Sequence, residues 1–172
     1  MKTILNKIDY DCGPVALYNA QEWLKINNKI NKKTHSYTRL LRLTKCSNEK
    51  RDIPAGTLRW NMDIENITKN KKTTYNKNLM LSSLKKGKAL IIHYNIQQPK
   101  KDLYIHHYVF IEKIKNKNNK NNNIKIYNIV GDYDNYDLEC DIDTFKSFVL
   151  DNNSRGYGAL DGLDYPFAWI ID

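Results

Sequence analysis

Hydrophobic residues recur at helical spacing directly after Cys12. The apolar positions of this stretch are Ala16, Leu17, Ala20, Trp23 and Leu24. They lie one, three or four residues apart, as expected for one face of an α-helix. Pro14 fits the first turn of such a helix, where its missing backbone N–H costs nothing. The pattern therefore predicts a helix that begins at or just after Cys12.

Four further stretches have patterns typical of helices. They are residues 36–44, 53–70, 78–88 and 141–153. Thr57 is the expected N-cap within the second stretch, and Gly87 is expected to end the helix of the third. Asp141 is expected to cap the fourth.

Strand patterns occupy most of the second half of the chain. They cover residues 89–94, 106–114, 124–130 and 165–172, which are rich in β-branched and aromatic side chains. The second and third of these flank the Asn- and Lys-rich segment 115–123, which predicts an antiparallel hairpin with a long tip. Because helices dominate the first half, we expect a single α+β domain spanning residues 1–172, with N-terminal helices packed on an antiparallel sheet.

Composition supports a globular protein. Hydrophobic residues make up 41% of the 172 residues, which is enough to bury a core. No apolar run approaches the ~20 residues that span a bilayer, and the start MKTILNKIDY becomes polar too soon for a signal peptide. We therefore expect a soluble, cytoplasmic protein without a membrane partner.

The net charge of +9 raises the question of a nucleic-acid partner. The lysines lie in Asn-rich loops such as segment 115–123, without the interleaved aromatic residues that stack on bases. Lys, Asn, Ile and Tyr are enriched together, as in proteins from AT-rich genomes. The pattern favours solvated lysines over a nucleic-acid interface.

The chain contains three widely separated cysteines, Cys12, Cys46 and Cys140. Their odd number argues against a disulfide framework, and no pair has the spacing of metal ligands. We therefore expect neither a structural metal nor a cofactor. Cys12 at a helix N-terminus would have a lowered pKa, because the positive end of the helix dipole stabilises a thiolate. An activated nucleophile and a buried structural cysteine are equally compatible with this stretch.

A nucleophilic cysteine needs a base, and the base needs a residue that orients it. Neighbouring His106 and His107 open a predicted strand and should point to opposite faces. In the predicted hairpin, whose centre lies near residues 119–120, Asp132 comes close to His107. Asn128 and Asp134 are alternative residues for orienting the imidazole.

The motif DCGPVAL, followed by a helix, resembles the nucleophile segment of the bacteriocin-processing, double-glycine-leader peptidases, a branch of the papain-like cysteine peptidases. Further segments resemble that family in the same order along the chain: AGTLRW, LSSLKKGKALIIHY, HYVFIEKI, GDYD and DTFKSFV. The resemblance covers most of the sequence and implies a papain-like fold.

The resemblance implies a role for four residues. Cys12 would be the nucleophile, His107 the general base and acid, and Asp132 the orienting residue. Asn6 stands where the family has an oxyanion-binding Gln and is one methylene shorter. The family aspartate precedes a proline, whereas Asp132 precedes Tyr133.

The activity implied is hydrolysis of a peptide or isopeptide bond through a thioester. Substrates would be peptides or proteins, with ubiquitin-like conjugates that end in Gly-Gly as one class. Three alternatives remain at this point: an acyltransferase or amidase with the same triad, a catalytically inactive papain-like binding module, and a nucleic-acid-binding protein. The sequence does not indicate an oligomeric state.

Overall fold

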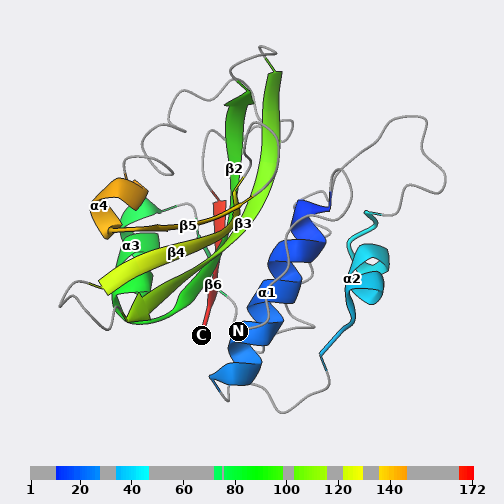
Figure 1. Ribbon diagram of the computed structural model, residues 1–172, viewed down its shortest axis with the longest axis horizontal. Coiled ribbons are helices and arrows are strands. Elements are labelled where there is room, and N and C mark those ends of the chain that lie inside the picture. The colour runs from blue at the N-terminus through cyan, green and yellow to red at the C-terminus, as the bar shows by residue number, and fades with distance from the viewer. Residues whose placement is uncertain are drawn as a thin grey trace.

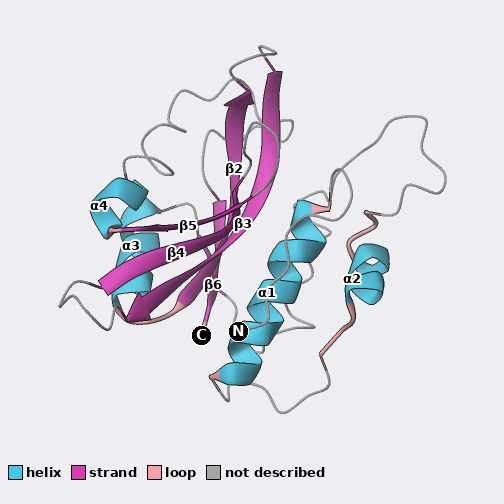
Figure 2. Ribbon diagram, viewed as in Figure 1, coloured by secondary structure: helices cyan, strands magenta, loops and turns pink. Residues whose placement is uncertain are grey.

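The computed structural model describes residues 11–27, 34–46, 72–74, 76–98, 103–115, 122–129, 136–146 and 167–172. Four helices and six strands lie within these ranges. Their order is α1 (Cys12–Ile26), α2 (Tyr37–Leu43), β1 (Lys72–Thr74), α3 (Lys77–Lys85), β2 (Ala89–Gln98), β3 (Leu103–Lys115), β4 (Asn122–Ile129), β5 (Tyr136–Cys140), α4 (Ile142–Phe145) and β6 (Phe167–Ile171). Figure 1 shows their arrangement, and Figure 2 shows the same view coloured by element type.

The six strands form one sheet in the order β1-β6-β2-β3-β4-β5. Every neighbouring pair is antiparallel. The expected α+β architecture with an antiparallel sheet is therefore confirmed. The four expected strands are present, whereas β1 and β5 were not predicted. The hairpin of β3 and β4 pairs Phe110 with Tyr127 and Lys115 with Asn122, so its centre lies between residues 118 and 119, about one residue before the predicted position.

Helix α1 begins at Cys12, as its pattern predicts. Its apolar face is buried against the sheet, where Leu17 and Leu24 join Tyr108 and Trp169 in one hydrophobic cluster. The 15-residue helix obtains its stability from this packing, because isolated helices of that length are marginal in water.

The other helices begin at residues whose side chains cap them with local hydrogen bonds. The side chains of Ser36, Asn76 and Asp141 accept from the backbone N–H three residues further on, capping α2, α3 and α4. Gly87 follows α3 with φ +77°, the left-handed conformation that glycine adopts without strain. Both predicted stop and cap residues, Gly87 and Asp141, are confirmed. The helix expected from Thr57 lies outside the described residues, and α4 is described only as far as Phe145.

The helices cover both faces of the sheet. Helix α1 lies on one face with α2 beside it, and α3 and α4 lie on the other (Figure 1). The reason is the alternation of side chains along the strands: apolar residues point to both faces of β2 and β3, so both faces need a cover. On β3, Tyr108 and Phe110 face α1, while Val109 and Ile111 face α3 and α4.

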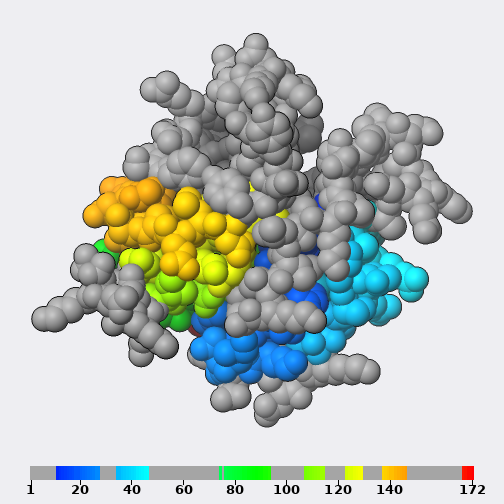
Figure 3. All heavy atoms as spheres, viewed as in Figure 1, coloured from blue at the N-terminus to red at the C-terminus, as the bar shows by residue number. Residues whose placement is uncertain are grey.

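The space-filling view shows α2 beside α1, with β5 and α4 on another part of the same side of the molecule (Figure 3). Strand β5 lies at one edge of the described sheet, and its residues Asp137 and Glu139 are exposed. Among the described residues, none of the helices is both long and apolar enough to cross a membrane.

Candidate active site

Cys12 is the first residue of α1 and is 5% exposed. It packs in the α1-side cluster with Tyr108 and Phe110 of β3. The preceding residue, Asp11, does not cap the helix with its side chain. The thiol therefore lies where the N-terminus of α1 meets the middle of the sheet.

Burial dominates the electrostatics of Cys12. Loss of solvent raises the pKa of the thiol to about 12, and the nearby charges of Cys46 and Asp11 act in the same direction. Backbone hydrogen bonds from Tyr108 and Gly13 lower it. The expected lowering of the pKa at the helix N-terminus is thus present through Gly13 but is outweighed by burial. The expectation of a lowered pKa for Cys12 is wrong, because burial raises this pKa.

Helix α2 is held against the start of α1 by a partly buried hydrogen bond. The hydroxyl of Tyr37 donates to Oδ2 of Asp11, whose side chain is inaccessible to solvent. Burial and this carboxylate raise the pKa of Tyr37. Gln21 adds a second connection, accepting from the N–H of His35 at 2.7 Å and donating to its carbonyl at 3.2 Å. These contacts fix the surroundings of the residue that precedes Cys12.

His107 lies on β3, directly before Tyr108, and is 3% exposed. Its Nε2 is 2.5 Å from the backbone carbonyl oxygen of Asn128. A carbonyl can only accept, so Nε2 carries the proton and Nδ1 carries the lone pair of the neutral ring. Burial lowers the pKa of His107 to about 4, and the contact with Asn128 opposes this shift. The resting imidazole is therefore neutral.

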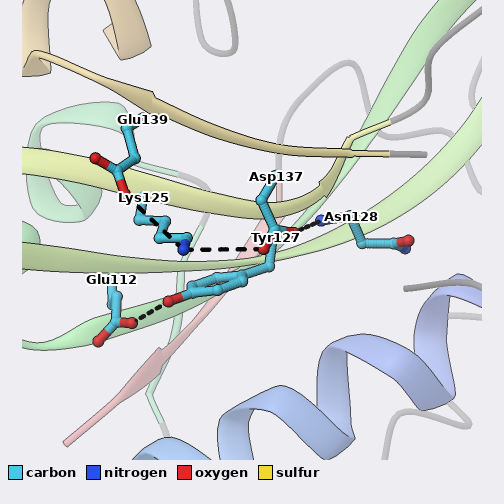
Figure 4. A network of polar contacts seen from close by, with 6 residues as sticks. All are labelled: Glu112, Lys125, Tyr127, Asn128, Asp137 and Glu139. Atoms are coloured by element: carbon cyan, nitrogen blue, oxygen red, sulfur yellow. Dashed lines mark hydrogen bonds and ion pairs between the residues drawn. The ribbon is translucent and has the colours of Figure 1, made fainter. Parts of the chain in front are cut away.

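Asn128 has an unusual backbone conformation. Its φ is +68°, in the left-handed region, and it lies where the register of β4 with β5 shifts between Ile126 and Ile129. Asparagine tolerates this conformation better than most residues. The N–H of Asn128 donates to Oδ1 of Asp137 at 3.1 Å, while its own side chain points away from Asp137 (Figure 4). The alternative role expected for Asn128 involved hydrogen bonding to the imidazole, and the structure shows such a contact through the main chain.

Cys12 contacts the short segment of β3 that carries His107. Cys12 is hydrogen bonded to the backbone of Tyr108, and His107 is the residue before it. The described β3–β4 ladder ends at Phe110 and Tyr127. Nε2 of His107 contacts the main-chain oxygen of Asn128 on the neighbouring strand, one residue beyond the last β4 residue of this ladder.

Other predicted site residues lie outside the described residues: Asn6, Asp132 and Asp134. Their roles stay predictions. Sequence reasoning missed Tyr37 and Asp137. Asp137, Leu138 and Glu139 alternate polar and apolar residues, and this signal of a strand could have drawn attention to β5.

The other histidine and cysteine side chains have no assigned catalytic role. His93 is stacked on Tyr108, with ring centroids 4.6 Å apart. Cys12, Cys46 and Cys140 are not joined in disulfides. Within the described ranges, no group of three or more His, Cys, Asp or Glu side chains is arranged to hold a metal ion.

Comparisons with protein-family models, with curated proteins and with solved structures find no match for this chain.

Proposed function

We propose that this protein is a cysteine peptidase with a papain-like arrangement, which hydrolyses a peptide or isopeptide bond. The observation that carries the proposal is the meeting of Cys12 and β3. The thiol at the start of a buried helix is hydrogen bonded to the backbone of Tyr108, and the adjacent His107 is held by Asn128. A helix that presents a cysteine to a histidine-bearing strand is also what the DCGPVAL resemblance implies.

The neutral resting pair suggests how the reaction begins. Neutral His107 takes the proton of the Cys12 thiol at Nδ1 as the sulfur attacks the substrate carbonyl. The resulting imidazolium protonates the leaving amine, and a thioester forms. Water then attacks the thioester, gives its proton to His107, and releases the acid while the proton returns to the sulfur. Asn6 is the proposed oxyanion donor, and Asp132 remains the proposed orienting carboxylate.

The substrate is proposed as a peptide or protein, with ubiquitin-like conjugates as one class. A catalytically inactive binding module is the second candidate, and the burial of Cys12 at 5% exposure favours it. Both candidates use the same fold, so reactivity is the property that separates them. An acyltransferase would share the thioester but transfer the acyl group to an amine instead of to water.

The test is reaction of the full-length protein with electrophilic probes. Iodoacetamide, a ubiquitin-like protein with a C-terminal vinyl sulfone, and a Gly-Gly peptide vinyl sulfone are compared by mass spectrometry of the labelled cysteines. Labelling of Cys12 should exceed that of Cys140, and His107→Ala should lower the Cys12 rate by about 100-fold or more.

Cys46 is the internal control, because it is also buried, at 2% exposure, but has no assigned catalytic role. Equal, slow labelling of Cys12 and Cys46 in the wild-type protein would overturn the peptidase proposal and favour the binding module. Preference among the probes would identify the substrate class.

A further inference from the structure

A carboxylate outside the predicted triad is linked to His107 through the main chain of Asn128. Oδ1 of Asp137 accepts from the N–H of Asn128 at 3.1 Å. The carbonyl oxygen of the same residue is 2.5 Å from Nε2 of His107. The two contacts therefore connect β5 to β3 through one residue of β4 (Figure 4).

The conformation of Asn128 makes this link specific. At φ +68° its peptide groups are turned out of the regular pattern of a strand. A non-glycine residue in the left-handed conformation is strained, so it needs support from its surroundings. Asp137, which accepts from the N–H of Asn128, provides that support. In this conformation the carbonyl of Asn128 contacts His107.

Asp137 is itself held in place. Its second carboxylate oxygen, Oδ2, is 3.9 Å from Nζ of Lys125, and the side chains of both residues are 27% exposed. Lys125 also lies 4.9 Å above the ring of Tyr127, whose hydroxyl donates to Glu112. These contacts fix the lysine over β4, and the lysine in turn faces the carboxylate.

We propose that Asp137 is a positioning residue for His107: it holds Asn128 in its left-handed conformation, so that the Asn128 carbonyl fixes the imidazole in the tautomer with the proton on Nε2. This inference rests on the proposed function, because it assigns Asp137 to the base of that reaction. Asp137 does not touch the reacting atoms, and the fixed tautomer leaves the lone pair on Nδ1.

Glu139 provides a matched control. It lies on the same strand, and its Oε1 is also 3.9 Å from Nζ of Lys125. Its side chain is 54% exposed, and no described contact joins it to Asn128. A variant at Glu139 therefore removes the ion pair to Lys125 and leaves the link to His107 intact.

The first measurement is the rate at which iodoacetamide alkylates Cys12 in the full-length protein. Asp137→Ala should lower the rate about 10- to 100-fold, as expected when a catalytic group is misplaced by a fraction of an ångström to 1 Å. Asp137→Asn should restore most of the rate, because it keeps an acceptor oxygen for the Asn128 N–H. Glu139→Ala should label like the wild-type protein. Equal rates for Asp137→Ala and Glu139→Ala would overturn the inference.

The second measurement is the tautomer of His107, read from ¹⁵N–¹H correlation spectra of the ring. The proton should be on Nε2 in the wild-type protein and in Glu139→Ala, and Asp137→Ala should give a mixture of both tautomers. A loss of stability alone would not change the tautomer of the folded protein. An unchanged Nε2-protonated ring in Asp137→Ala would contradict the inference.

A third comparison applies even if Asp137→Ala does not fold. Asn128→Gly and Asn128→Ala both remove the side chain, but only glycine adopts φ +68° without strain. Cys12 should be alkylated about fivefold faster in the glycine variant than in the alanine variant. Equal rates would show that the left-handed conformation is not what positions the imidazole.

The outcomes separate this inference from the proposed function. If His107→Ala alkylates as fast as the wild-type protein, the proposed function fails, and the tautomer spectrum still decides whether Asp137 positions the ring. If His107→Ala is slow while Asp137→Ala and Glu139→Ala are equal, the function stands and the inference fails.

Discussion

The two faces of the sheet are built from different side chains. Among the described residues, the face under α3 and α4 is almost entirely aliphatic, and Phe145 is the one aromatic residue in its cluster. The face under α1 contains Tyr108, Tyr127 and Trp169 together with the Cys12 thiol. Fully or nearly fully buried polar residues also gather on or beside α1: Asp11, Asn19 and Gln21.

The difference suggests that one face mainly stabilises the fold, whereas the other holds the reactive groups. Aliphatic residues gain free energy by leaving water and make no demand for partners. A buried polar group costs free energy unless it is hydrogen bonded, so each one on the α1 side needs a fixed partner. Tyr37 is such a partner for Asp11. Burial of polar groups on the α1 side thus costs more free energy, and this is the face where the thiol lies.

The largest effect should come from cavities, which test whether the two faces are independent. Leu84 of α3 and Leu17 of α1 are both fully buried, one on each face. Replacement of either by alanine should lower the free energy of unfolding by about 2–5 kcal/mol, measured by urea denaturation.

Only Leu17→Ala should change the alkylation rate of Cys12 under native conditions, because Leu17 shares the cluster with the thiol. If Leu84→Ala altered that rate as much, the faces would be coupled and the separation of stability from chemistry would be wrong.

A smaller effect concerns acid sensitivity. The pKa of His107 is lowered from 6.5 to about 4, so the unfolded chain binds a proton at a higher pH than the folded one. The stability that this neutral histidine contributes is complete above pH 6.5 and is lost as the pH falls from 6.5 to 4. Between pH 7 and 4.5 the loss is on the order of 2–3 kcal/mol.

The measurement is urea denaturation of the wild-type protein and His107→Gln at both pH values. The variant has no imidazole to protonate, so its stability should fall less over this range. An identical fall in the two proteins would mean that protonation of buried His107 is not the cause of the loss. A fall confined to values above pH 6.5 would contradict the sign of the shift.

The smallest effect is expected at the contact between α2 and the start of α1. Tyr37→Phe removes the donor to Asp11 and should lower the free energy of unfolding by about 1–2 kcal/mol. Tyr18→Phe, a half-buried tyrosine of α1, is the control for loss of a hydroxyl. If the two variants lose equal stability, the Tyr37 contact contributes nothing specific to the α1 side.

Much of the fold follows from local patterns. The start of α1, the Gly87 stop, the Asp141 cap and the β3–β4 hairpin could be predicted because each depends on neighbouring residues. The pairing of β6 with β1 and β2 joins distant segments and has no local signature. Strand β1 was missed because its three residues are too few for a clear period, whereas β5 carries a short alternation that was overlooked.

The site could be predicted in its residue types better than in its electrostatics. The motif around Cys12 predicts a cysteine at a helix start, and this is what the structure contains. It says nothing of how deeply the thiol is buried, and burial decides the pKa. The contact of His107 with a main-chain carbonyl was equally inaccessible, because any residue supplies a carbonyl and only the left-handed Asn128 directs it.

The strand order also governs when the protein can mature during synthesis. Strand β6 follows every other described strand in sequence but lies between β1 and β2, and its residues Trp169 and Ile171 pack against α1. A nascent chain on the ribosome therefore holds its cysteine-bearing helix without that support until translation has passed Ile171. Assembly of the sheet is a late, long-range event, of the kind that folds slowly. Cys12 is therefore synthesised early, but its cluster is completed only when β6 has joined the sheet.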